Sequence, residues 1–178
     1  MKQKNEKKLS VTKIEAAKRQ LVTAVRLFFQ ESDAITIHTL TCAGQEILEV
    51  VGKSKGIKSM KQKTLDLARD KEFFLKKMDE AKNFFKHGNR DSNKTIEFSP
   101  EYTELVLWDA VQMYYFITQE KVPAFAMYDL WTFSKYPEIF KLPFEQERSY
   151  KNALGSVTSE NKDWFLQGID KLEKRFGN

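Results

Sequence analysis

The chain has 178 residues, of which 41% are hydrophobic and 31% charged, and it contains only seven glycines and four prolines. This length suits one domain with a large core, and the low glycine and proline content argues against collagen-like, disordered and turn-rich all-β proteins. No stretch reaches the roughly 20 apolar residues of a membrane span, the N-terminus has no apolar run typical of a signal peptide, and a lone cysteine excludes an internal disulfide framework. We therefore expect a cytoplasmic protein that does not enter a membrane.

The net charge of +5 is concentrated at the N-terminus, where residues 1–9 carry four lysines against one glutamate. We expect residues 1–9 to be a disordered basic tail and residues 10–178 to be a single all-α domain. Five further lysines fall within eleven residues that contain no acid: Lys53, Lys55, Lys58, Lys61 and Lys63. This lysine cluster is typical of a solvated linker between helices, and the alternative is a set of phosphate contacts.

Hydrophobic spacing is helical almost throughout the chain. Thr12 and Glu15 form a capping-box pattern ahead of an apolar stripe, which predicts a first helix that ends near residues 32–33. A second helix is expected over about residues 36–51, and Gly52 stops it.

A third helical region is expected over residues 64–87, with a break near Asp70. Residues 88–93 have the composition of a loop. Ser99 and Pro100 then give the strongest helix start in the chain, a capping residue followed by proline at the first position, and the predicted helix runs to about residue 119.

Pro123 opens a further predicted helix. Residues 139–150 contain Pro143 and are expected to be irregular or to form only a short helix. A last helix is expected over residues 160–175, with Ser159 as its cap. The sequence therefore predicts an all-α protein, a single helical bundle of about five to seven helices.

Aromatic residues are abundant, with 14 phenylalanines, six tyrosines and three tryptophans. A thick core between widely spaced helices explains most of them. The alternative is that some of them line a ligand pocket or a dimer face: Tyr114, Tyr115, Tyr128 and Trp131.

His38, Cys42 and Glu46 are spaced to share one face of the second helix. With two histidines and one cysteine in the chain, we expect no metal site and no cofactor, and we expect Cys42 to be a small buried apolar residue. Two interpretations of His38 stay open. It is either a buried histidine bonded to a backbone or carboxylate group, or a partner of His87 in one site.

The densest group of polar side chains beside apolar ones lies at the end of the third helical region: Lys82, Asn83, Lys86, His87 and Arg90. Asn83 and His87 are one helical turn apart and share a face. This group is either a functional site or an ordinary cationic helix end, in which Gly88 would take the left-handed conformation.

The pattern of a basic residue, Asn, three residues and His, closing a helix of an all-α bundle, resembles HEPN domains (higher eukaryotes and prokaryotes nucleotide-binding). Many members of that family are metal-independent ribonucleases that act as dimers through an arginine–histidine motif, and Lys82 stands here where the family has arginine. The resemblance implies that His87 is the general acid or base, that Lys82 or Arg90 stabilises charge in the transition state, and that Asn83 orients the imidazole or binds phosphate. We place the remaining candidates among the substrate-binding residues: Lys86, Arg90, His38 and Glu46.

A second resemblance covers more of the chain and leads to no reaction. Four segments are similar to a group of bacterial helical proteins of about this size that have no assigned activity: residues 26–29, 37–40, 83–87 and 109–111.

These features lead to one main hypothesis and two alternatives. The main hypothesis is an RNA-cleaving or nucleotide-binding domain, with RNA or a nucleotide as its partner and a homodimer as its assembly. The alternatives are a non-enzymatic helical module that dimerises or binds a protein, and a small-ligand site in an aromatic pocket.

Overall fold

The computed structural model describes residues 8–67, 71–89, 93–140 and 142–176. Within these residues the chain is all-α, as predicted, with eight α-helices and no strand. The helices are α1 (Lys13–Phe29), α2 (Ala34–Lys53), α3 (Met60–Leu67), α4 (Lys71–Lys86), α5 (Pro100–Thr118), α6 (Pro123–Lys135), α7 (Phe144–Leu154) and α8 (Lys162–Phe176), with a 3₁₀ turn η1 (Pro137–Ile139) after α6.

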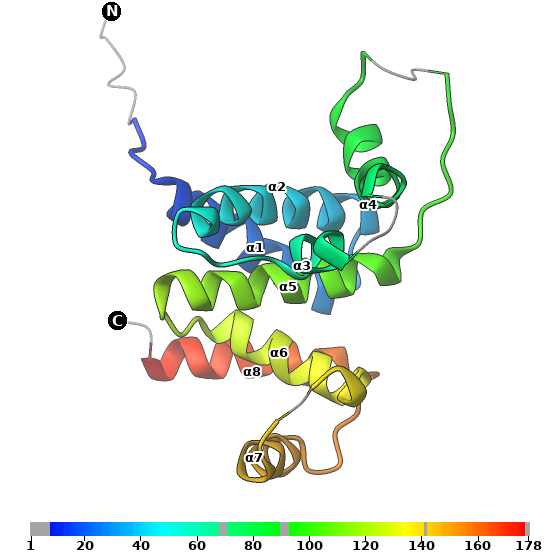
Figure 1. The fold of residues 1–178 in the computed structure, drawn as a ribbon. Coiled ribbons are helices and arrows are strands. Elements are labelled where there is room, and N and C mark those ends of the chain that lie inside the picture. Colours follow the sequence, from blue (N-terminus) through cyan, green and yellow to red (C-terminus); the bar gives the residue numbers. More distant parts are fainter. Residues whose placement is uncertain (1–7, 68–70, 90–92, 141, 177–178) are drawn as a thin grey trace, which may run out of the picture.

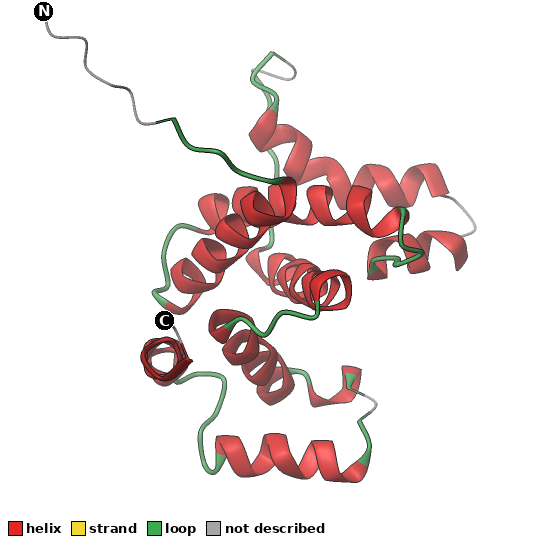
Figure 2. Cartoon of the chain, turned by 90° about the vertical axis from the view of Figure 1, so that its left-hand side faces the viewer, coloured by secondary structure: helices red, strands yellow, loops and turns green. Residues whose placement is uncertain are grey.

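The helices lie in two groups on either side of α5 (Figure 1). α1 and α2 pack against each other and both contact α5, with α4 beside α2 and α3 beside α4. On the other side of α5, α6 packs against α8 and α7. Figure 2 shows the same division from the side, with α7 lying beyond α6. None of the helices in the described part of the chain is long and apolar enough to cross a membrane.

One hydrophobic core runs through α1, α2, α5, α6 and α8. Three of the four aromatic residues considered for a pocket or dimer face belong to this core, because Tyr114, Tyr128 and Trp131 are at most 1% exposed. Tyr115 is 40% exposed. The expectation of a thick aromatic core is therefore confirmed for these three, and of the four only Tyr115 is presented at the surface.

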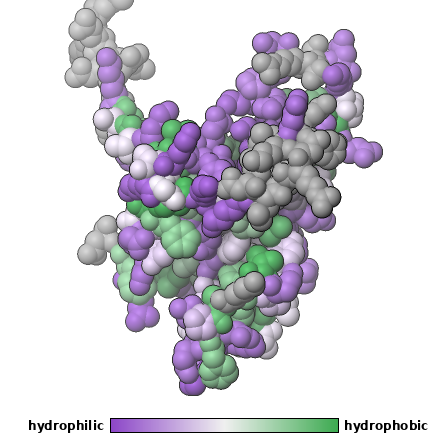
Figure 3. All heavy atoms as spheres, in the orientation of Figure 1, coloured by the Kyte–Doolittle hydropathy of each residue, from purple (hydrophilic) through white to green (hydrophobic). Residues whose placement is uncertain are grey.

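The polar side chains are unevenly distributed over the surface. Figure 3 shows hydrophilic side chains gathered over the upper part of one face, where α2 and α4 lie, and hydrophobic side chains lower down, over α5 and α6. The large exposed apolar side chains of α5 are Tyr115 and Phe116, at 40% and 55% exposure.

The helix ends agree with the sequence in part. Thr12 caps α1 as predicted, because its hydroxyl accepts a hydrogen bond from the Glu15 amide at 3.1 Å. The predicted cap of the last helix is wrong: α8 begins at Lys162, and the Asn161 side chain accepts from the Trp164 amide at 3.2 Å. Asparagine and serine are equally good helix caps. Asn161 takes the role because it directly precedes the first residue of α8.

Residues 68–70 and residues 1–7 lie outside the described residues, so the break expected near Asp70 and most of the basic tail are not described. The third helical region divides into α3 and α4. α7 is longer than the short or irregular segment expected there.

α1 and α2 approach closely at Gly44. A Cβ atom at this position would lie 2.8 Å from Leu21 Cγ, in a part of the core where Leu21 is fully buried. Glycine is therefore required here for packing, and not for its backbone freedom.

We predict that Gly44→Val lowers the free energy of unfolding by about 1–3 kcal/mol, because the added carbons must displace Leu21 or separate the two helices. Gly88→Ala is the control, because a Cβ atom at Gly88 meets no atom within 4 Å. Chemical denaturation measures both variants. A Gly44→Val protein as stable as the wild type would contradict the close packing of α1 on α2.

Candidate functional site

The last turns of α4 lie against α2 through charged side chains. Lys82 and Lys86 of α4 both approach the carboxylate of Glu46 on α2, with Nζ to Oε2 distances of 3.6 and 3.5 Å. The Lys82 ammonium is the main reason that the pKa of Glu46 is lowered from its ordinary value. The structure therefore brings together three of the residues predicted for the site, from two helices.

Lys82 and Lys86 differ in how firmly they are held. The Lys82 side chain is 21% exposed and also lies 3.7 Å from Asp79, one turn earlier on α4. Asp79 in turn accepts a hydrogen bond from Lys61 of α3 at 2.6 Å. The Lys86 side chain is 54% exposed and pairs with Glu46, so it is the more accessible of the two cations.

His87 follows directly on the last turn of α4. Its backbone amide donates to the Asn83 carbonyl at 3.1 Å, and its side chain is partly exposed beside the exposed Asn83. Gly88 does not take the left-handed conformation, which corrects that part of the helix-end interpretation; the positive-φ glycines in the described residues are Gly56 and Gly155. Arg90, the last residue predicted for this group, lies outside the described residues.

His38 lies in the interior and does not open onto the same surface. Its ring is fully buried, with Nδ1 2.9 Å from the Thr103 hydroxyl and Nε2 3.4 Å from the Cys42 sulfur. Two phenylalanine rings, Phe98 and Phe85, meet it edge-on at 4.9 and 5.9 Å between centroids. A ligand on the surface of α4 therefore has no direct path to His38, and its hydrogen bonds go to side chains and not to the backbone or carboxylate group that the sequence predicted.

Burial sets the chemistry of this interior pair. It lowers the pKa of His38 to about 4 and raises the pKa of Cys42 to about 12. The imidazole is therefore neutral and the sulfur is a thiol near neutral pH, so the pair is inert as a nucleophile and base. Among the described residues, no group of three or more His, Cys, Asp and Glu side chains could hold a metal ion.

The sequence did not single out a second polar connection, centred on Asp109 of α5. Its carboxylate accepts from Gln45 of α2 at 3.0 Å and from the Met60 amide at the start of α3 at 2.9 Å. Burial raises the pKa of Asp109. The sequence signal that indicates this connection is an acid in an otherwise apolar stretch, between Trp108 and Ala110.

Four lysines of the cluster are exposed, as expected for a solvated segment: Lys53, Lys55, Lys58 and Lys63. Lys61 is the exception, since it is held by Asp79, with only 12% of its side chain exposed. Lys55 donates to the Ile117 carbonyl at the end of α5 at 3.0 Å, where a cation is favoured by the helix dipole. Lys58 and Lys63 line a cavity against α5.

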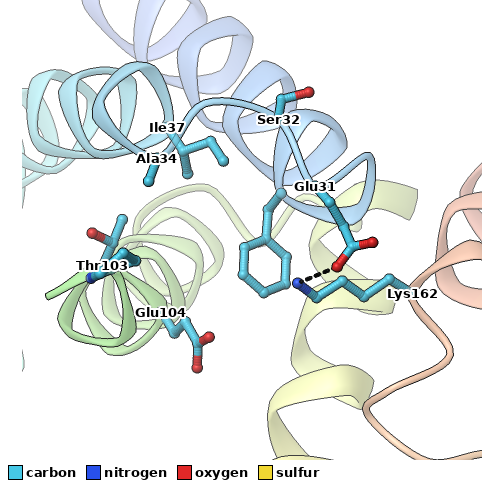
Figure 4. Close-up of a pocket in the computed structure, with 9 residues that line it drawn as sticks. Glu31, Ser32, Ala34, Ile37, Thr103, Glu104 and Lys162 are labelled. Carbon is cyan, nitrogen blue, oxygen red and sulfur yellow. Dashed lines mark hydrogen bonds and ion pairs between the residues drawn. The ribbon is translucent and has the colours of Figure 1, made fainter.

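A smaller hollow of about 200 Å³ lies between the end of α1 and the starts of α2 and α5 (Figure 4). Lys162 reaches across it, 4.7 Å from the centre of the Phe28 ring and 3.4 Å from the Glu31 carboxylate. Glu104, on its wall, is already bonded to Lys135 and Tyr136. The charged side chains of the hollow are thus each in an ion pair, Lys162 with Glu31 and Glu104 with Lys135.

Comparisons with protein-family models, with curated proteins and with solved structures find no match for this chain.

The buried His38 makes stability depend on pH. Its pKa is about 4 in the folded protein and 6.5 in an unfolded chain, so the unfolded state binds the proton more readily between these values. Acidification through this window is therefore expected to lower the free energy of unfolding, by up to about 1.4 kcal/mol per pH unit.

This dependence is measured by denaturant titration at several pH values in the wild type and in His38→Gln, which removes the titrating group. The free energy of unfolding of the wild type should fall toward that of His38→Gln as the pH falls from 6.5 toward 4. The control His87→Gln, at the partly exposed histidine, should keep the wild-type dependence. A His38→Gln variant with an unchanged pH dependence would contradict the sealed, neutral imidazole.

Proposed function

We propose that this protein binds single-stranded RNA at the end of α4 and cleaves it there, with His87 as the proton-transfer group. The observation that carries the proposal is the placement of the two imidazoles. His87 is partly exposed just beyond a turn that bears two lysines, whereas His38 is sealed in the interior.

The cations of α4 supply the phosphate-binding part of the proposal. The end of a helix carries exposed carbonyls, which repel an anion, so an RNA phosphate needs side-chain cations there. Lys86 is the exposed cation, and Glu46 is its counter-ion. A phosphate that binds Lys86 therefore replaces the Glu46 carboxylate as the partner of the ammonium group.

The chemistry follows from an imidazole beside a bound phosphodiester. The ribose 2′-oxygen attacks phosphorus as its proton leaves to a base; the bond from phosphorus to the 5′-oxygen breaks, and that oxygen takes a proton from an acid. The products are a 2′,3′-cyclic phosphate and a free 5′-hydroxyl. Lys86 would stabilise the charge on the phosphorane-like transition state, and Lys82, held by Glu46 and Asp79, would keep the α4 turn in place.

The two proton transfers require two groups, and each chain offers one accessible imidazole among its described residues. A homodimer that brings two copies of His87 to one phosphate supplies both, in agreement with the resemblance to HEPN domains. Lys82 stands where the HEPN family has arginine, and a lysine is a point charge that cannot make a bidentate contact with phosphate. Tight RNA binding therefore depends on contacts outside the last turn of α4.

The first test changes the charge around Lys86. Lys86→Ala should weaken the binding of a fluorescein-labelled single-stranded RNA by about fivefold, and Glu46→Gln should strengthen it because the competing carboxylate is gone. The controls come from α7, where Glu147 and Lys151 form an exposed glutamate–lysine ion pair within one helix. Lys151→Ala and Glu147→Gln make the same charge changes, and each should alter the affinity for RNA by less than half as much as Lys86→Ala and Glu46→Gln. Equal effects at both pairs, measured by fluorescence anisotropy, would contradict binding at α4.

The second test concerns the imidazole. His87→Ala should lower the rate of RNA cleavage by at least about 100-fold, while RNA binding stays within twofold of the wild type. The free energy of unfolding should change by less than about 1 kcal/mol, because the side chain is partly exposed. Gel analysis of labelled RNA measures the cleavage. A wild-type protein that binds RNA and leaves it intact, or a His87→Ala variant that still cleaves, would contradict the cleavage step.

A further inference from the structure

The loop after α2 encloses a cavity against the outer face of α5. The loop runs alongside α5 (Figure 1), tied at one end by Lys55 to the Ile117 carbonyl and at the other by the Met60 amide to Asp109. The cavity between them has a volume of about 440 Å³. This volume is large enough for one nucleotide unit.

The α5 side of the cavity presents two aromatic rings with an amide between them. Trp108, Gln112 and Phe116 are spaced four residues apart and all line the cavity, so they form one stripe along the helix. Phe116 is 55% exposed, which leaves a large ring surface for a ligand. Aromatic rings of this kind bind nucleobases by stacking, whatever the base.

The middle of the stripe is fixed before any ligand arrives. The indole nitrogen of Trp108 and the amide nitrogen of Gln112 both donate to Asp129 Oδ1 on α6, at 2.8 and 2.7 Å. Because its nitrogen is used in this way, the amide oxygen of Gln112 is the atom left to accept a hydrogen bond from a base amino group.

The loop side of the cavity supplies positive charge. Lys58 and Lys63 line it, and both are exposed. Among the described residues of the wall, Asp109 is the one carboxylate, and each of its oxygens already has a hydrogen-bond donor, from the Met60 amide and the Gln45 side chain. The two lysines supply the positive charge that a phosphate needs there.

We propose that this cavity binds one nucleotide of single-stranded RNA, with the base against Trp108 and Phe116 and the phosphate at Lys58 and Lys63. The inference rests on the proposed function in one respect, because it takes the ligand to be the same RNA that binds at α4. The cavity then adds base stacking and further phosphate contacts to the phosphate contact of Lys86.

The experiment measures the affinity for the labelled RNA in variants of the stripe. Phe116→Ala should weaken binding about tenfold, and Lys63→Ala should weaken it about threefold and reduce the salt slope by about 0.7. The matched controls are Tyr115→Ala and Lys121→Ala, neighbouring exposed residues that face a different cavity. The controls should stay within twofold of the wild type. Equal losses in the stripe variants and their controls, or no loss in either, would overturn the inference.

A second measurement separates this cavity from the α4 site. Adenosine 5′-monophosphate should quench tryptophan fluorescence in the wild type and not in Trp108→Phe, since Trp131 is buried and Trp164 belongs to α8 and does not line this cavity. Quenching that persists in Trp108→Phe would overturn the cavity as a base site.

If Lys86→Ala weakens RNA binding while Phe116→Ala does not, the α4 site stands and the cavity fails. If Phe116→Ala weakens binding while Lys86→Ala and Glu46→Gln have no effect, the cavity stands and the α4 site fails.

Discussion

The hydrogen bonds to the Asp109 carboxylate are the interaction that holds the segment between α2 and α3 against α5. The carboxylate lies buried in α5 and joins three elements, because it accepts from Gln45 of α2 and from the first amide of α3. A buried carboxylate is costly unless both oxygens are bonded, so this geometry strongly favours one position for the loop between α2 and α3. The loop carries Lys58 and the first turn of α3 carries Lys63, the two lysines that line the cavity on α5.

α4 is attached to this framework in a different way. The central helices share an apolar core, whereas the last turns of α4 contact α2 through Glu46 and its two lysines, with Asp79 and Lys61 continuing the network to α3. Partly exposed ion pairs are individually weak and are screened by salt. The edge-on packing of Phe85 against His38 adds an apolar contact beneath them. The end of α4 is thus held by charge and one aromatic cluster, and a bound phosphate can compete for the charges without unfolding the core.

The sequence predicts the helices better than it predicts the site. Apolar spacing and Pro100 place α5 within a residue of its observed ends, because both signals are local. Pro143 predicts irregular structure, but it stands just before the first residue of α7, where proline is compatible with a helix start. Lys82 and His87 were found from local spacing. The pairing of Lys82 with Glu46 and the connections of Asp109 depend on how α2, α4 and α5 pack. Residue spacing along one helix carries no information on that packing.

Taken together, the α4 turn and the α5 cavity give two basic surfaces on one framework, and we propose that one RNA strand contacts both. Photochemical cross-linking of a single-stranded RNA, followed by mass spectrometry of the attached peptides, tests this most directly. The account predicts cross-links in the peptide around residues 83–89 and in the peptide that holds Trp108 and Phe116, with fewer in Phe116→Ala. Cross-links confined to the lysines of residues 1–9 would contradict it, because RNA would then be bound by the basic tail and not by the folded surface.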